Sequence, residues 1–331
     1  MVKVSVIGAG SWGTALATVL ASKDIKVDLW ARNKEQLADM REHRENKKYL
    51  PGVTLSENIN MVDNLGDAIK GSSAVLFSVP TQAFRENFKN ALEFLTDDMV
   101  VINVAKGFEL GSLKRISQIA EELKPNVKFC VLSGPSHAEE VGKRLPTAVS
   151  CVSSNKEVSE YVQDLFFTDR FRTYVNDDLV GVEVGSALKN IIALGTGISD
   201  GMGFGDNAKA GIMTRGLTEI ARLGLALGAK RETFLGLTGV GDLIVTCTSM
   251  HSRNRRCGML IGQGKTPKEA TLEIGMVVES MYTTEAAYEL AKKVGVEMPI
   301  THIIYDIIKG KVTADDAVEI LMGREKKNEK I

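Results

Sequence analysis

Three glycines near the N-terminus have the spacing of a phosphate-binding turn. The segment GAGSWG, from Gly8 to Gly13, fits the pattern G-x-G-x-x-G. In that pattern the first glycine permits a tight turn, the second lets a pyrophosphate approach the backbone, and the third allows a helix to pack closely on a strand. Unpaired N–H groups at the start of the following helix then attract the phosphates. We therefore expect this turn to bind NAD or NADP.

The residues around the turn supply the context that a dinucleotide site requires. Val2–Ile7 predicts a short strand, Thr14–Ser22 predicts a helix, and Lys26–Ala31 predicts a second strand. A glycine turn without a ligand is the alternative, and the order strand, turn, helix, strand argues against it.

The tip of the second expected strand should contact the adenine ribose. An acidic residue there accepts a hydrogen bond from the 2′-hydroxyl of NAD, whereas an arginine accommodates the 2′-phosphate of NADP. Asp28 lies inside the expected strand, but Arg32 lies at its tip, about 20 residues beyond Gly13. We therefore expect Arg32 to favour NADPH over NADH. The alternative is a solvent-exposed arginine in an ordinary loop.

A second group of residues suited to bind phosphate is the segment SRNRR, Ser252 to Arg256. Guanidinium groups match the geometry of phosphate, and serine and asparagine add neutral hydrogen-bond donors. A run of positive charge is more often a solvated face of a helix. The segment is a candidate for binding the phosphate of a small substrate, and the solvated face stays open as the alternative at this point.

The elements that must position these residues follow from the pattern of apolar runs. Further expected strands are Ala74–Val79, Val100–Val104 and Lys128–Leu132. Helix-like segments lie between them, which predicts a mostly parallel sheet covered by helices. Such a sheet binds ligands outside the carboxyl ends of its strands, and Lys106 and Gly134 both follow an expected strand.

The pattern changes after Val175, where long helical segments replace the strands. The expected helices are Val180–Leu194, Lys209–Leu227, Met281–Lys293 and Ile300–Ile308. Five glycines in a polar stretch resemble a loop: Gly195, Gly197, Gly201, Gly203 and Gly205. We expect an α/β, Rossmann-type dinucleotide-binding domain over residues 1–178 and an all-α substrate-binding and catalytic domain over residues 179–331.

Composition excludes several other classes. The 331 residues are 44% hydrophobic and 25% charged with a net charge of -1, which argues against general affinity for nucleic acid or anionic membranes. The four cysteines lack a C-x-x-C spacing and predict free thiols in a reducing compartment. We find no signal-peptide pattern, no run near the roughly 18 apolar residues that span a membrane, and no metal-binding spacing. We expect a cytoplasmic enzyme and consider a homodimer for its assembly.

Longer motifs resemble those of the bacterial glycerol-3-phosphate dehydrogenase family over essentially the whole chain. They are GAGSWGTALA, FSVPTQAF, NVAKGFE, LSGPSHAEEV, ALKNIIALGTGISDG, GLTGVGDLIVTCTS, SRNRRCGMLIGQG and IGMVVES. One variation is His137, where phenylalanine is more usual. The resemblance implies reversible conversion of dihydroxyacetone phosphate to sn-glycerol 3-phosphate with NADH or NADPH, at the start of glycerophospholipid synthesis.

The resemblance also implies roles for three charged residues. Lys189 would be the catalytic acid and base, and its apolar neighbours argue against the alternative of a solvated helix lysine. Lys106 would lie beside cofactor and substrate and stabilise alkoxide charge, unless it is a surface loop lysine. Asp242 would bind the substrate and orient the nearby lysine, and an N-cap role is the alternative.

The remaining contacts are implied in the same way. The other substrate contacts would be Gly134, Ser136, Ser252, Arg253 and Asn254, with Arg255 and Arg256 as surface or structural residues. The cofactor contacts already argued from the glycine turn and the second strand are Gly8, Gly10, Gly13 and Arg32. The resemblance adds Ser11, Trp12, Asn33, Tyr49, Lys106, Ala138, Arg253, Val277 and Glu279.

Two other interpretations fit parts of the sequence. A related dehydrogenase of β-hydroxy acids or sugar acid phosphates would share the architecture, but SRNRR and GVGDL argue against it. A non-catalytic dinucleotide sensor would keep the glycine turn, but it need not keep Lys106, Lys189 and Asp242 together.

Overall fold

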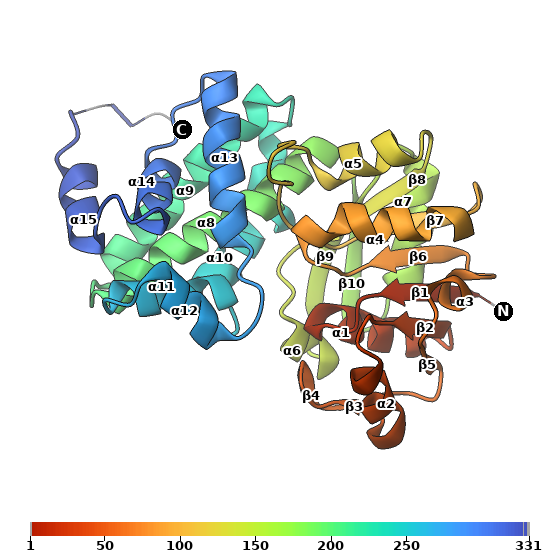
Figure 1. The fold of residues 1–331 in the computed structure, drawn as a ribbon. Helices are drawn as coiled ribbons and strands as arrows, with labels where there is room; N and C mark the ends of the chain where they lie inside the picture. The colour runs from red at the N-terminus through yellow and green to blue at the C-terminus, as the bar shows by residue number, and fades with distance from the viewer. Residues whose placement is uncertain (1, 327, 330–331) are drawn as a thin grey trace. The chain divides into compact units, whose positions relative to one another are not determined.

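The chain forms two compact units in the computed structural model, which describes residues 2–326, 328 and 329 (Figure 1). The first unit comprises the described residues up to Ala105 together with Ile116–Leu179. The second comprises Lys106–Arg115 and the described residues from Val180 onward. The domain boundary after residue 178 remains a prediction. The short segment Lys106–Arg115, which lies between two parts of the first unit in sequence, belongs to the second unit and carries Lys106.

A single eight-stranded sheet organises the first unit. Its strands are β1 (Lys3–Ile7), β2 (Lys26–Trp30), β5 (Ile59–Val62), β6 (Ala74–Phe77), β7 (Val100–Asn103), β8 (Lys128–Ser133), β9 (Thr147–Val152) and β10 (Phe171–Asn176). They lie in the order β10-β9-β8-β7-β6-β1-β2-β5, and every neighbouring pair is parallel except β8 with β9. The expected mostly parallel sheet is therefore confirmed. Strand order reverses at β1, the kind of position where such sheets bind ligands.

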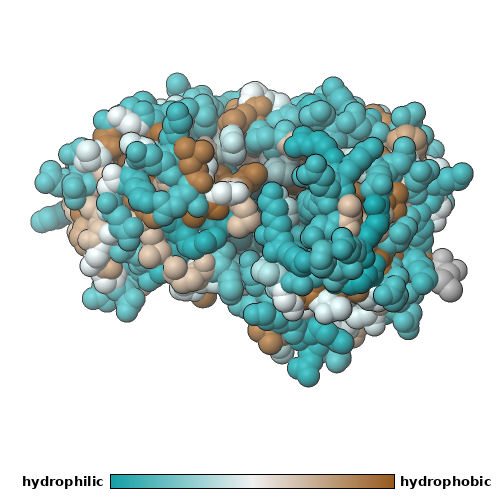
Figure 2. All heavy atoms as spheres, turned by 60° about the horizontal axis from the view of Figure 1, so that its bottom comes forward, coloured by the Kyte–Doolittle hydropathy of each residue, from teal (hydrophilic) through white to brown (hydrophobic). Residues whose placement is uncertain are grey.

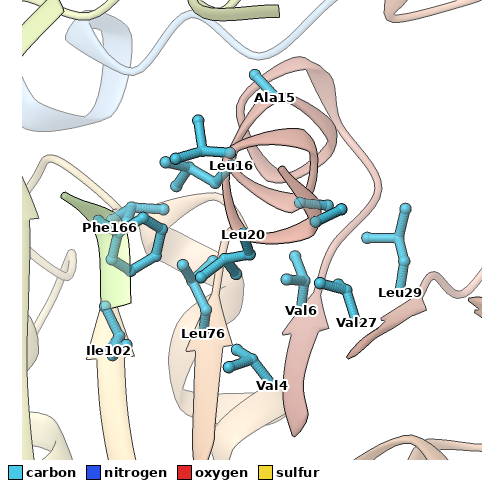
Figure 3. Packing of buried hydrophobic residues seen from close by; sticks show 14 of the residues in the cluster. Val4, Val6, Ala15, Leu16, Leu20, Val27, Leu29, Leu76, Ile102 and Phe166 are labelled. Carbon is cyan, nitrogen blue, oxygen red and sulfur yellow. The ribbon is translucent and has the colours of Figure 1, made fainter. Parts of the chain in front are cut away.

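Helices cover the sheet and bury its apolar strands. They are α1 (Ser11–Ala21), α2 (Lys34–His43), α3 (Leu65–Ile69), α4 (Phe84–Ala91), α5 (Ile116–Leu123), α6 (Ala138–Gly142) and α7 (Lys156–Phe166). All residues of β6 and β7 are buried, as in a parallel sheet covered on both faces. Figure 3 shows Leu20 of α1 close to Leu76 of β6 and Val6 of β1, and Leu16 on the side of Phe166. A small antiparallel sheet, β3 (Glu45–Asn46) with β4 (Leu50–Thr54), follows α2.

The second unit is helical in its described residues. Its helices are α8 (Leu179–Gly201), α9 (Asp206–Ala226), α10 (Asp242–Thr248), α11 (Arg253–Gly262), α12 (Pro267–Ile274), α13 (Ser280–Val294), α14 (Pro299–Ile308) and α15 (Ala314–Met322). A π-helical turn, Leu237–Gly241, leads into α10. On the face in Figure 2 hydrophilic residues predominate and apolar residues form small patches. The expected all-helical region is confirmed.

Helix α8 corrects two expectations from the sequence. With 23 residues and a mean hydropathy of 1.3 in its most apolar window, it is long and apolar enough to cross a membrane, which the sequence analysis missed. Because 89% of that window is buried inside the protein, it is a core helix. The expected glycine loop is wrong for Gly195, Gly197 and Gly201, which lie within this helix, and right for Gly203 and Gly205, which lie between α8 and α9.

The glycines of α8 serve close helix packing. A Cβ atom at Gly197 would lie 2.1 Å from the carbonyl oxygen of Arg255, and one at Gly201 would lie 2.2 Å from that of Met259. On the facing helix α11, a Cβ atom at Gly258 would likewise lie 2.1 Å from the carbonyl oxygen of Leu194. The two backbones are therefore in direct contact, which only glycine permits.

Candidate active site

Two lysines of the second unit share one buried carboxylate. Lys189 lies in the middle of α8, and its Nζ is 2.6 Å from Oδ1 of Asp242, the first residue of α10. Lys106 is the first residue of the segment Lys106–Arg115, and its Nζ is 2.7 Å from Oδ2 of the same aspartate. The structure thus brings together the three charged residues that the sequence analysis selected as a group.

Burial and charge determine the protonation of this cluster. Burial lowers the pKa of Lys189 to about 8, the charge of Asp242 opposes that shift, and the charge of Lys106 adds to it. Burial alone would raise the pKa of Asp242, but the two lysines outweigh it and hold that pKa below its usual value. The cluster therefore contains an anionic aspartate and a lysine able to lose and regain a proton near neutral pH.

Two neighbouring polar residues, which the sequence analysis did not select, support the cluster. Thr246 lies one turn after Asp242 in α10, and its hydroxyl accepts a hydrogen bond of 2.7 Å from Nζ of Lys189. The same hydroxyl donates to the main-chain oxygen of Asp242. Asn190 follows Lys189 in α8 and donates from Nδ2 to the main-chain oxygen of Lys106 at 3.3 Å. The spacing of Thr246 from Asp242, one helical turn, was the available signal.

The start of α11 is connected to this cluster by hydrogen bonds through Asn190. Nδ2 of Asn254 donates to Oδ1 of Asn190 at 3.0 Å, and Oδ1 of Asn254 accepts from the main-chain N–H of Ser280 at 3.0 Å. Ser252 is the N-cap, and its hydroxyl accepts from the N–H of Arg255. Arg253, the first residue of the helix, is half-buried.

Arg255 has a structural role rather than a place on the surface. Its Nε and one terminal nitrogen lie 2.8 and 2.7 Å from the same carboxylate oxygen of Asp200 near the end of α8. Lys209 of α9 lies 2.9 Å from the other oxygen. This network joins three helices and fixes α11 on α8. Arg256 is half-buried.

The glycine turn of the first unit has the shape expected of a pyrophosphate site. Gly8 has a φ of +113°, and a Cβ atom there would lie 2.4 Å from the carbonyl oxygen of Ser78. A Cβ atom at Gly13 would lie 2.0 Å from the carbonyl oxygen of Gly8, so this glycine allows α1 to approach the turn. Around Gly10, in contrast, no atom lies within 4 Å of such a Cβ. This open side, next to the N-terminus of α1 at Ser11, fits a bound dinucleotide.

The other expected cofactor and substrate contacts of the first unit lie in loops and at helix starts. Arg32 is exposed in the loop after β2, whereas Asp28 lies inside that strand and pairs with Lys3 at 2.6 Å. Asn33 is the N-cap of α2, and its side chain accepts from the N–H of Gln36. The remaining expected positions are Trp12 in α1, Tyr49 before β4, Gly134 and Ser136 after β8, and Ala138 at the start of α6.

Two expected cofactor contacts lie in the second unit between α12 and α13. Val277 is exposed, and Glu279 occupies the N-cap position of α13. The expected contacts are thus divided between the units: the glycine turn, Arg32, Gly134 and Ser136 belong to the first, while the lysines, Asp242 and the start of α11 belong to the second.

A glycine turn of the dinucleotide-binding type at the reversal point of a mostly parallel sheet, and a buried lysine with a lowered pKa, fit the class of the NAD(P)-dependent dehydrogenases. Comparison with known proteins gives the family. Residues 3–159 match the N-terminal part of NAD-dependent glycerol-3-phosphate dehydrogenase, and residues 178–319 match its C-terminal part. The chain belongs to this family.

Relatives and solved structures agree with that assignment over the full length. The chain is 51% identical to a glycerol-3-phosphate dehydrogenase [NAD(P)+] of Clostridium perfringens, with 100% of both chains covered. It is 54% identical to that of Geobacillus thermodenitrificans, with 99% of this chain and 97% of the relative covered. The crystal structure of glycerol-3-phosphate dehydrogenase from Coxiella burnetii is similar with a TM-score of 0.94 and 39% identity, covering 97% of this chain and 99% of that one.

Proposed function

We propose that the protein reversibly reduces dihydroxyacetone phosphate to sn-glycerol 3-phosphate with NADPH or NADH, and that it supplies glycerophospholipid synthesis in the cytoplasm. The observation that carries this proposal is the buried pair of Lys189 and Asp242, which provides an acid for ketone reduction. When bound, NAD(P)H would supply the hydride. The homodimer considered from the sequence remains a prediction that light scattering would test.

Lys189 acts as the acid in reduction and as the base in oxidation. Of its three ammonium hydrogens, Asp242 and Thr246 bind two, so the third can donate to the substrate oxygen. As negative charge develops on that oxygen, the proton moves to it from Nζ. A lysine whose pKa lies at about 8 gives up this proton more readily than a solvated lysine does.

Lys106 and Asp242 prepare the site for the charge that develops. The ammonium of Lys106 lies on the second oxygen of Asp242, where its positive charge stabilises an alkoxide. Asp242 keeps both lysines in place and keeps Lys189 protonated near neutral pH, because its charge favours the ammonium form.

The substrate phosphate binds at the start of α11. This helix has ten residues, and its N-terminus carries the positive end of the helix dipole. Arg253 adds a guanidinium at the first position, and Ser252 and Asn254 flank it. Gly134 and Ser136 remain substrate contacts proposed from the sequence.

Initial rates of NADPH and NADH oxidation with three ketones would test this function. We expect turnover with dihydroxyacetone phosphate and far less with unphosphorylated dihydroxyacetone, because only the former engages α11. Turnover of a β-keto acid in preference to dihydroxyacetone phosphate would instead support the related class of β-hydroxy acid dehydrogenases.

Arg32 is the proposed determinant of cofactor preference. It is exposed just beyond β2, where it can contact a 2′-phosphate. Arg32→Ala should therefore raise the Michaelis constant for NADPH and leave that for NADH almost unchanged. An equal effect on both cofactors would contradict the proposed preference for NADPH.

A further inference from the structure

Two side-chain amides from outside the glycine turn bind the same carbonyl oxygen within it. Nε2 of Gln36, in α2, lies 2.6 Å from the main-chain oxygen of Ala9. Nδ2 of Asn46, in β3, lies 3.0 Å from the same oxygen. Ala9 stands between the first two glycines of the turn, so these bonds act on the part of the backbone that a pyrophosphate must approach.

Holding this oxygen fixes the direction of the next N–H group. The peptide between Ala9 and Gly10 is trans and planar, so its C=O and N–H groups point in opposite directions. With the oxygen held toward Gln36 and Asn46, the N–H of Gly10 must face away from them. If this peptide turned over, a carbonyl oxygen would take the place of the N–H and repel a phosphate.

The turn needs such a restraint because glycine does little to hold its own backbone. Gly8 is in a positive-φ conformation, and Gly10 has no neighbour within 4 Å of where a Cβ would be. Peptide groups next to glycine rotate at low steric cost. Bonds from outside the turn must therefore select the orientation that binds phosphate.

Asn46 is suited to this task because all its polar atoms are committed. The residue is 1% exposed. Besides Ala9, its Nδ2 donates to the hydroxyl of Thr14 in α1 at 2.8 Å, and its Oδ1 accepts from the N–H of Tyr49 at 3.3 Å. These contacts leave one orientation of the amide, with its donor side toward the turn. The small sheet β3–β4 thus carries a residue that acts on the glycine turn.

We propose that Asn46 and Gln36 are positioning residues that hold the Ala9–Gly10 peptide in the orientation that binds the cofactor pyrophosphate. Neither residue was selected as a cofactor contact, and neither needs to touch the cofactor. The inference rests on dinucleotide binding at this turn, so NADPH binding by the wild-type protein is measured first.

Fluorescence titration of the cofactor-free protein would test the proposal. Three ligands are compared: NADPH, ADP-ribose, which retains the pyrophosphate, and adenosine 2′-phosphate, which lacks it. Gln36→Ala and Asn46→Ala should each weaken NADPH and ADP-ribose by about 3- to 10-fold, the scale of one hydrogen bond. Binding of adenosine 2′-phosphate should not change. The double variant should lose more than the product of the single effects, because in each single variant the remaining amide still holds the peptide in part.

Controls separate this role from a general structural one. Asn87→Ala removes an asparagine in α4 that donates to the carbonyl oxygen of Ala83 at 2.8 Å, and it should leave all three affinities unchanged. Gln36→Ala alters only the half-buried side of α2, so it tests the proposal even if Asn46→Ala fails to fold. The Michaelis constant for dihydroxyacetone phosphate at saturating NADPH should stay at its wild-type value.

Distinct results would overturn the inference. Unchanged NADPH affinity in the Gln36→Ala protein would show that the hydrogen bond from Gln36 to Ala9 does not contribute to cofactor binding. Equal weakening of adenosine 2′-phosphate and NADPH would show that the variants disturb the whole unit. Absence of NADPH binding by the wild-type protein would instead reject the proposed function together with this inference.

Discussion

Lys189 and Asp242 form an ion pair with 2.6 Å between Nζ and Oδ1, and their side chains are only 7% and 2% exposed. Taking two charges out of water is costly, and a buried ion pair is weak support for stability. Lys106 adds a second positive charge on the same aspartate. The cluster therefore has a net positive charge inside the unit, which suits the stabilisation of a developing alkoxide better than it suits folding.

The pH dependence of catalysis should follow the proton on Lys189. Reduction needs the ammonium form, so its rate should fall as pH rises through about 8. Oxidation needs the neutral amine, so its rate should rise through the same value. Initial rates in both directions across this range would measure the two profiles. Identical pH–rate profiles for reduction and oxidation would show that Lys189 does not transfer the proton.

Variants at the pair sharpen this prediction. Asp242→Asn removes the charge that raises the pKa of Lys189, while burial and Lys106 continue to lower it. The reduction profile should therefore shift to lower pH. Lys189→Met should lower turnover by about 10²-fold or more while cofactor binding persists. Lys309→Met, which removes a surface lysine paired with Glu285, is the matched control.

The glycine turn and the charged cluster were predictable for different reasons. The turn is a local pattern, and β1, α1 and β2 lie within three residues of the ranges expected from it. Lys106, Lys189 and Asp242 were selected through motif resemblance, and nothing in their spacing required that both lysines bind one carboxylate. Only the fold brings residues 106, 189 and 242 within hydrogen-bond distance.

The wrong expectations came from contacts that are distant in sequence. Gly197 and Gly201 resembled a loop because glycine disfavours helices in isolation. In the protein they permit contact with the backbone of α11, more than fifty residues later, and that packing outweighs their low helix propensity. Asn46 was overlooked for the same reason, because its partners Ala9 and Thr14 precede it by 37 and 32 residues.

Alanine at two glycines of the turn should separate folding from cofactor binding. At Gly10 a Cβ meets no atom within 4 Å, so Gly10→Ala should fold normally but obstruct the approach of the pyrophosphate. At Gly13 a Cβ would lie 2.0 Å from the carbonyl oxygen of Gly8, so Gly13→Ala should lower the melting temperature. Thermal unfolding and NADPH titration of both variants would check this. Equal melting temperatures would contradict the packing role of Gly13.

Loss of Arg253 should affect the phosphorylated substrate selectively. Arg253→Ala should raise the Michaelis constant for dihydroxyacetone phosphate by about 10- to 100-fold, since a hydrogen bond to a charged group contributes about 1.5–3 kcal/mol. Any turnover of unphosphorylated dihydroxyacetone should be much less sensitive. Lys265→Ala removes a positive charge beyond the other end of α11, where Lys265 pairs with Glu273. This control should leave the Michaelis constants for both substrates unchanged. Equal losses with both substrates would mean that Arg253 supports the site generally.

A buried glutamate in the second unit should make stability depend on pH. Glu219 of α9 is 3% exposed, and its carboxylate accepts hydrogen bonds from the N–H groups of Ile300 and Thr301 at 2.6 and 3.1 Å, at the start of α14. Burial nevertheless raises the pKa of Glu219 from 4.5 to about 7. The folded protein therefore binds this proton more tightly than the unfolded chain does.

The sign of the effect follows from that difference. As pH rises from about 4.5 to about 7, the unfolded chain releases the proton first, so Glu219 should lower the free energy of unfolding across this interval, by about 3 kcal/mol in total. The side chain of Gln in Glu219→Gln cannot titrate. Measured by denaturant unfolding, the free energy of unfolding of this variant should therefore rise relative to that of the wild type over the same pH range. Glu269→Gln should behave in the opposite way, because hydrogen bonds from Thr266 lower the pKa of Glu269 and its contribution is lost as pH falls. Parallel stability curves for Glu219→Gln and the wild type would show that burial does not raise the pKa of Glu219.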